Sequence, residues 1–183
     1  MDDVREKSGA SAPSRAATRA QIFATFNRLM LEGESNRPKV ADIVAEAGVA
    51  RSTFYDHFDG VEALFDESLS MLLGQVAQCL VGRRSGGEMA WLMAHVYDNR
   101  ERGRDMLAGP GAGRTEALLA RLLMRELEGR AEARLHAILV AGTVMAALGA
   151  WVTGKLSATP AALAERLVAT AQAILAVAPD TSA

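Results

Sequence analysis

The segment from Val40 to Phe58 constrains the fold more than any other part of this chain. Its first half repeats apolar residues at helical spacing, which gives one face of a helix: Val40, Ile43, Val44 and Ala47. Gly48 follows, and a glycine ends a helix readily because it adopts positive φ without a Cβ clash. Val49 and Phe58 are the next residues expected to be buried. The pattern predicts two helices joined by a tight turn, a helix-turn-helix.

The second helix of this motif carries side chains that donate hydrogen bonds: Arg51, Ser52, Thr53, Tyr55 and His57. A helix of this kind fits the major groove of DNA, which is about 12 Å wide. Arginine is the usual reader of guanine, so Arg51 and Ser52 are candidates for contact with base edges, and Thr53 for a base or the backbone. The alternative for these residues is a solvated helix face.

Residues 43–58 resemble the TetR family of transcriptional regulators. The matching positions are an Ile, a Gly-Val pair, a Tyr-x-His-Phe run and a following Leu: Ile43, Gly48, Val49, Tyr55, His57, Phe58 and Leu64. The resemblance implies an all-α protein with an N-terminal three-helix domain and a C-terminal helical ligand-binding and dimerisation domain. It also implies that Tyr55 and His57 contact phosphates. Three positions depart from the family pattern, namely Lys39, Ala50 and Val61.

The expected DNA-binding residues extend over the first three helices: Arg15, Arg19, Lys39, Val40, Ala50, Arg51, Ser52, Thr53, Tyr55 and His57. The formal net charge of the chain is −2, and residues 13–60 contain six Lys or Arg and six Asp or Glu. DNA binding must therefore depend on where the cations lie, because the net charge does not favour it.

The rest of the chain is predicted to be helical. Half of the residues are hydrophobic but only 5% are aromatic, so the core is expected to be aliphatic. We expect a disordered tail at 1–13, the helix-turn-helix domain at 14–60, and the ligand-binding and dimerisation domain at 61–183. Glycine and charge patterns predict a turn or helix end at 98–104 and a loop at 108–113. The helices are expected at 14–31, 61–81, 89–97, 115–128, 132–155 and 160–177.

No pattern points to catalysis, a cofactor or a metal. Cys79 is the sole cysteine, which excludes an internal disulfide, and its apolar surroundings favour a buried thiol over a reactive one. The glycine-rich run at 109–115 lacks the lysine and the preceding strand of a phosphate loop. His95 and His136 lack partners at metal-ligand spacing. The uncharged run at 137–154 favours a buried helix over a membrane span, and we expect a cytoplasmic protein without a membrane partner.

The C-terminal residues suggest a ligand pocket and a dimer interface. Pocket candidates are Met89, Trp91, Met93, Tyr97 and Met124, with His136 or Thr143 as a hydrogen-bonding group, although plain core packing is equally consistent. Interface candidates are Leu135, Gly142, Met145, Gly149, Trp151 and Val152. The sequence thus predicts a homodimeric repressor that a small, mostly apolar effector releases from operator DNA. The alternative is a helical small-molecule-binding protein or interaction bundle without a DNA function.

Overall fold

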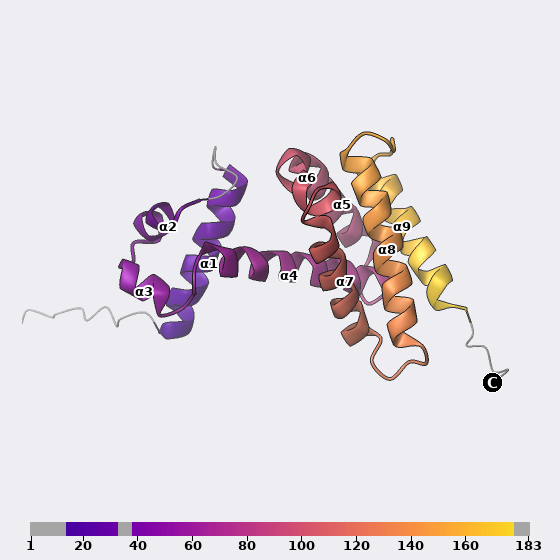
Figure 1. Ribbon diagram of the computed structural model, residues 1–183, viewed down its shortest axis with the longest axis horizontal. Coiled ribbons are helices and arrows are strands. Elements are labelled where there is room, and N and C mark those ends of the chain that lie inside the picture. Colours follow the sequence, from indigo (N-terminus) through magenta and orange to yellow (C-terminus); the bar gives the residue numbers. More distant parts are fainter. Residues whose placement is uncertain (1–13, 33–37, 178–183) are drawn as a thin grey trace, which may run out of the picture. The chain divides into compact units, whose positions relative to one another are not determined.

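The computed structural model describes residues 14–32 and 38–177, apart from the side chains of residues 31, 32 and 102. Within that part all regular structure is helical, as the sequence predicts (Figure 1). The chain divides into two units, Met1–Asp66 and Glu67–Ala183, and this division lies inside the fourth helix. The predicted tail at 1–13 lies outside the described residues.

The first unit contains α1 (Arg15–Glu32), α2 (Val40–Ala47), α3 (Arg51–Tyr55) and the start of α4 (Val61–Leu80). One residue or more from each helix enters a common core: Ile22, Phe26, Ile43, Ala47, Phe54, Phe58 and Leu64. Three of these side chains are phenylalanines, although aromatic residues are scarce in the chain as a whole. The aromatic residues therefore concentrate where a small domain has few positions with which to build a core.

The turn between α2 and α3 is closed by its glycine. Gly48 has φ 65° and ψ 32°, the left-handed conformation that a residue with a Cβ rarely adopts. The amide of Val49 donates to the carbonyl of Val44 at 3.1 Å, which ends α2. The side chain of Gln21 on α1 donates to the carbonyl of Ala47 at 2.7 Å. The end of α2 is thus tied to α1, and the direction in which α3 leaves the turn is fixed.

The second unit contains the rest of α4 together with α5 (Gly86–Asp98), α6 (Arg100–Ala108), α7 (Ala112–Glu126), α8 (Ala133–Val152) and α9 (Pro160–Leu175). In this unit α8 packs against α6, α7 and α9, and α9 packs against α5 (Figure 1). Burial on several sides explains why α8 is apolar around its circumference. Within the described residues α8 is also the one helix that length and composition would let cross a membrane, and half of its apolar window is buried inside the protein.

The helix α6 was not predicted, since Asp98–Arg104 was expected to be a turn or a helix end. This part of the chain is too highly charged to show an apolar period, which is the signal on which the prediction depended. An ion pair between Glu101 and Arg104, 3.1 Å apart, spans one turn of α6, and Leu107 packs against the core. The next helix also begins earlier than expected, at Ala112 rather than at 115.

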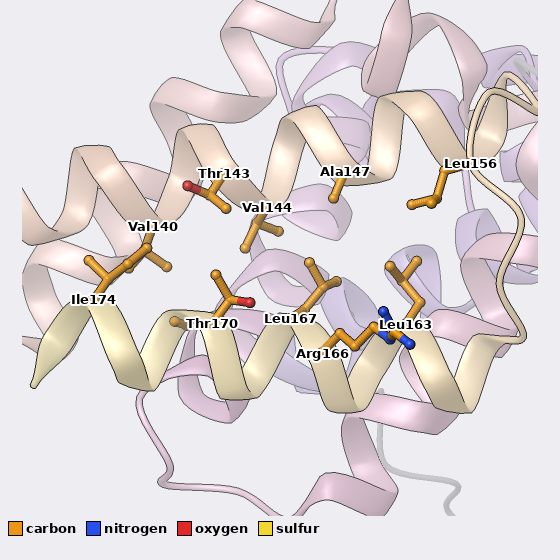
Figure 2. A pocket seen from close by; sticks show the side chains of 11 residues that line it. Val140, Thr143, Val144, Ala147, Leu156, Leu163, Arg166, Leu167, Thr170 and Ile174 are labelled. Carbon is orange, nitrogen blue, oxygen red and sulfur yellow. The ribbon is translucent and has the colours of Figure 1, made fainter.

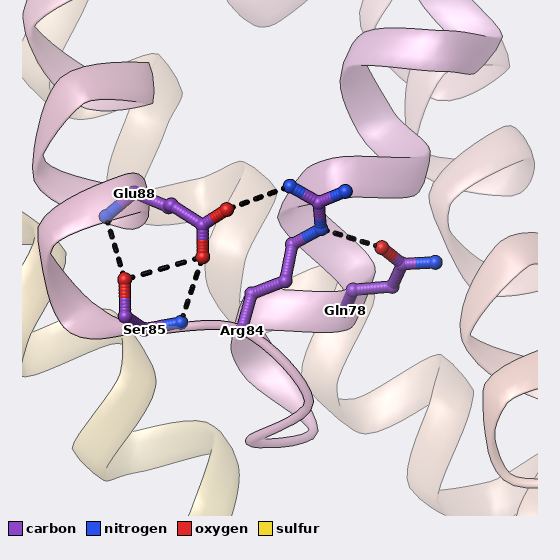
Figure 3. Close-up of polar contacts among 4 residues, drawn as sticks. All are labelled: Gln78, Arg84, Ser85 and Glu88. Atoms are coloured by element: carbon purple, nitrogen blue, oxygen red, sulfur yellow. Dashed lines mark hydrogen bonds and ion pairs between the residues drawn. The ribbon is translucent and has the colours of Figure 1, made fainter.

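A polar network closes the connection from α4 to α5 (Figure 3). The hydroxyl of Ser85 accepts from the amide of Glu88 at 3.3 Å, while the Glu88 carboxylate accepts from the amide of Ser85 at 2.9 Å. This reciprocal capping box begins α5. Arg84 donates to Glu88 at 2.8 Å and to Gln78 on α4 at 2.7 Å. Arg84 therefore links the start of α5 to the end of α4.

Candidate nucleic-acid interface

The orientation of α3 is set by one buried aromatic ring. Phe54 is fully buried in the core of the first unit, and its ring lies 6.0 Å from that of Phe58 and 5.4 Å from that of Tyr55. With Phe54 turned inward, Arg51 and Ser52 are exposed, and Tyr55 is 48% exposed. The helix thus presents hydrogen-bonding side chains on its outer face, as direct readout of base edges requires.

The other predicted residues on and beside α3 differ in exposure. Thr53 and His57 are half-buried, and the guanidinium of Arg51 lies 5.9 Å from the ring centre of Tyr55. Arg51 and Tyr55 are thus neighbours on one helix face, which brings a candidate base reader next to a candidate phosphate donor. Ala50 is exposed and precedes α3 without a side-chain cap, which agrees with the departure from the family pattern noted in the sequence.

Lys39 occupies the position before α2, and its side chain does not cap the helix because an ammonium cannot accept a hydrogen bond. The cap comes instead from Asp42, whose carboxylate accepts from the backbone amide of Lys39 at 2.9 Å. The Lys39 side chain is exposed, while Val40 beside it is half-buried. The first turn of α2 is thus stabilised without the Lys39 ammonium, which points into solvent near the start of the motif.

The basic residues of α1 meet the end of α3. Arg15 donates through Nη2 to the backbone carbonyl of Asp56 at 2.9 Å. The guanidinium of Arg19 lies over the ring of Phe58, 4.6 Å from its centre. Both arginines therefore adjoin the helix-turn-helix and also hold it together. A further pair, Arg28 with Glu46 at 2.6 Å, joins α1 to α2 and offsets one of the acidic charges of this unit.

The predicted ligand-pocket residues of the second unit do not share one cavity. Met89 and Met93 are fully buried core residues, and His136 is 7% exposed. Trp91 is 63% exposed and stacks on His95, with ring centres 5.7 Å apart. Met124 is also exposed, whereas Tyr97 and Thr143 line two different pockets. Helical spacing placed these residues on the helices of the second unit, but it did not show which side of each helix faces a cavity.

The smaller of the two pockets is an apolar groove of about 160 Å³ between α8 and α9 (Figure 2). Aliphatic side chains of the two helices face each other across it, with Thr143, Thr170 and Arg166 among the polar ones (Figure 2). The larger pocket, of about 690 Å³, lies between α5, α6 and the connection from α8 to α9. Sequence reasoning missed Arg100 and Arg104, which line it, because their segment was expected to be a turn.

The predicted dimer-interface residues lie on two sides of α8. Met145, Trp151 and Val152 are at most 4% exposed and belong to the core of their own unit. Gly149 faces α6, since a Cβ built on it would lie 2.7 Å from the carbonyl oxygen of Leu107. These four positions pack within one chain and are not available to a partner. Gly142 is half-buried. The large apolar side chains that α8 exposes are Leu135, Ile138 and Leu139, each about half exposed.

Metal-binding side chains are not clustered in the part of the chain that the structure describes. No group of three or more His, Cys, Asp or Glu side chains is placed there so that it could hold a metal ion. Cys79 is buried, and burial raises the pKa of its thiol, with a smaller contribution from the negative charge of Glu88. The thiol is thereby kept in its unreactive, protonated form.

Comparison with known proteins finds a family model that matches a short segment of the chain and solved structures that share its fold. Residues 28–68 match the family model of the bacterial regulatory proteins, tetR family. A TetR transcriptional regulator from Streptococcus agalactiae 2603V aligns with TM-score 0.52 and 18% identity, over 86% of this chain and 94% of that one. The dihydroxyacetone kinase operon activator DhaS aligns with TM-score 0.52 and 16% identity, over 86% and 96%.

A third solved structure is Thermus thermophilus FadR, a TetR-family transcriptional repressor in complex with lauroyl-CoA. It aligns with TM-score 0.50 and 18% identity, over 90% of this chain and 98% of that one. No curated protein sequence matches the chain significantly. At these identities the solved structures support the fold, and the family model supports the helix-turn-helix segment. The two findings together confirm the resemblance to the TetR family of transcriptional regulators.

Proposed function

We propose that this chain is a homodimeric, DNA-binding transcriptional regulator, and that a small ligand releases it from its operator. The observation that carries the proposal is the geometry of α3. Its Phe54 is buried, and the same helix exposes Arg51, Ser52 and Tyr55. An exposed row of donors on the second helix of a helix-turn-helix has the chemistry that reads a major groove.

We assign the contacts by the placement of each side chain. Arg51, Ser52 and Thr53 read base edges, since they lie on the recognition helix. Tyr55, His57 and Lys39 contact phosphates and set the register of the helix. Arg15 and Arg19 meet the backbone while also tying α1 to the end of α3. Val40 begins α2 and Ala50 directly precedes α3, and we assign both to backbone contacts with the DNA.

A dimer follows from the need for two recognition helices. We place the interface on the exposed side of α8, around Leu135, Ile138 and Leu139, together with the apolar groove between α8 and α9. A second copy related by a twofold axis buries these side chains in a four-helix arrangement. Such a dimer should bind a near-palindrome with half-sites about 34–36 Å apart.

Regulation requires that the ligand prefer the released conformation. A hundredfold loss of operator affinity needs a difference of about 2.8 kcal/mol in ligand binding between the two states. The complex of Thermus thermophilus FadR with lauroyl-CoA supports a ligand-responsive mechanism. We propose an effector with a mostly apolar body, acting on a cytoplasmic repressor that is not an enzyme. The neighbour DhaS is an operon activator, so a reporter assay must distinguish repression from activation.

The experiment is selection of bound sequences from a random double-stranded DNA library, followed by mobility shifts at physiological salt. Arg51→Ala should relax discrimination at particular base positions by about 1–3 kcal/mol if Arg51 is bidentate to a guanine. Tyr55→Phe should weaken binding evenly across sequences. Arg121→Ala, an exposed arginine on α7, is the matched control and should change neither. Wild-type protein that enriches no sequence would overturn the proposal and favour a helical ligand-binding or interaction protein.

A further inference from the structure

The larger pocket of the second unit has the volume of a small-molecule site and is open to solvent. Its volume is about 690 Å³, within the range of about 300–1,000 Å³ that is usual for such sites. Its lining comes from the end of α5, from α6, from the end of α8, and from the connection that leads into α9. All of these elements belong to one unit.

One side of this pocket is aromatic and held in place. The rings of Tyr97 and Trp151 lie 5.1 Å apart at 36° to each other. The indole Nε1 of Trp151 donates to the carbonyl of Ala158 at 2.9 Å, which fixes the ring against the connection. The two rings pack on each other and Trp151 is only 4% exposed, so the aromatic surface open to a ligand is that of Tyr97, which is 38% exposed. Val152 and Leu156 extend the apolar part of the lining.

The other side of the pocket is cationic. The guanidinium of Arg100 lies 4.5 Å from the ring centre of Tyr97, and its Nη1 donates to the Tyr97 carbonyl at 2.9 Å. Arg104 contacts the carboxylate of Glu101 at 3.1 Å, in a pair whose side chains are 51% and 72% exposed. Each guanidinium carries five N–H donors. The two hydrogen bonds just described occupy one N–H of Arg100 and one N–H of Arg104. The residues that line the pocket include both arginines and no carboxylate.

We propose that this pocket binds a small planar aromatic carboxylate, whose ring packs against Tyr97 and Leu156 and whose carboxylate is bound by Arg100 and Arg104. The geometry favours an anion because the planar fork of a guanidinium matches a carboxylate. Arg100 is already held over Tyr97, so little side-chain freedom is lost when a ligand binds. The exposed ion pair between Glu101 and Arg104 competes only weakly with the ligand, since surface ion pairs contribute little to stability. This inference rests on the proposed function, and it assigns the effector an acidic group in addition to an apolar body.

The first test needs no variant. Isothermal titration of the full-length protein with benzoate, 2-naphthoate and indole-3-acetate is compared with titration of the corresponding neutral amides. At neutral pH we expect at least one acid to bind at least tenfold more tightly than its amide, because bonds to a charged partner are the stronger ones. Added salt should reduce the affinity for the acid more than that for the amide. Equal affinity of acid and amide, or binding of neither, overturns the proposal.

The second test locates the site. Arg104→Gln should weaken binding of the acid about ten- to hundredfold and leave binding of the amide unchanged. Arg121→Gln on α7 lies outside the lining and should bind both as the wild type does. Circular dichroism of both variants controls for folding. If Arg104→Gln binds the acid as tightly as the wild type, the pocket is not the site and the proposal fails.

Operator binding separates this inference from the regulatory proposal. Protein that binds the acid through Arg104 and loses operator affinity when the acid is added supports both. Protein that binds a selected operator but discriminates no acid from its amide overturns the pocket assignment and leaves the DNA-binding proposal standing. Acid binding that depends on Arg104, in protein that selects no DNA sequence, supports the pocket and overturns the regulator.

Discussion

Replacing Gly149 by alanine should destabilise the second unit, although the same change ordinarily stabilises a helix. Alanine in a helix interior is favoured over glycine by about 0.5–1 kcal/mol, because glycine loses more backbone entropy. At Gly149 the new Cβ would lie 2.7 Å from the carbonyl oxygen of Leu107. That atom belongs to the backbone of α6, so it cannot rotate away as the end of a flexible side chain can.

The size of the effect follows from comparison with Gly142 on the same helix. A Cβ at Gly142 has the Glu116 carboxylate oxygen as its nearest neighbour at 3.6 Å, which is an ordinary contact. Gly142→Ala should therefore show only the intrinsic helix gain, whereas Gly149→Ala adds an overpacking cost of about 1–3 kcal/mol. Since the intrinsic gain is common to both variants, the difference between them should equal that cost.

Urea unfolding followed by circular dichroism measures both variants at one protein concentration, because the proposed dimerisation would make apparent stability depend on concentration. For a chain of this size, each kcal/mol corresponds to about 2–4 °C in melting temperature. Gly74→Ala on α4, where no atom lies within 4 Å of the added Cβ, is a second control away from α8. If Gly149→Ala proves as stable as Gly142→Ala, the close approach of α6 and α8 is refuted.

Four further outcomes are expected. Ser85→Ala should cost about 1 kcal/mol in the free energy of unfolding, because α5 loses its cap. The backbone amide of Ser85 holds the pKa of Glu88 below its ordinary value of 4.5. The ionised Glu88 therefore stabilises the folded state fully above pH 4.5, and this contribution is lost as the pH falls through the lowered pKa. The difference in urea midpoint between wild type and Glu88→Gln should accordingly shrink below pH 4.5. Cys79 should react with Ellman's reagent far more slowly in native than in unfolded protein, and equal rates would contradict its burial. Leu139→Arg should shift the proposed dimer to monomer in light scattering at micromolar concentration, and an unchanged mass would refute the placement of the interface.

The helix-turn-helix could be predicted because its signals are local. The apolar period of α2, the glycine after it and the spacing to Phe58 depend on neighbouring residues alone, and the structure has each of them. The charged helix α6 was missed for the same reason, since its stability comes from packing of Leu107 and not from a visible period. Local patterns thus identify elements whose amphipathic face lies within one segment.

Which side of α8 faces the core was not predictable. The helix is apolar all round, so its sequence offers several equivalent stripes. The side that faces the core is determined by α6, which approaches α8 closely at Gly149, and by the neighbouring helices, which bury Met145 and Val152. The larger pocket was missed because it combines Tyr97, Trp151 and two arginines from segments far apart in the chain.

The placement of Trp151 gives the protein an optical reporter of its own. The chain has two tryptophans, and they sit in opposite surroundings: Trp151 is 4% exposed and hydrogen-bonded to Ala158, while Trp91 is 63% exposed. Iodide in solution should therefore quench the emission of Trp91 and leave that of Trp151 nearly untouched. In a Trp91→Phe variant the remaining tryptophan emission comes from Trp151 alone. The wavelength of its maximum then reports changes in the connection between α8 and α9, to which the Trp151 indole is hydrogen-bonded.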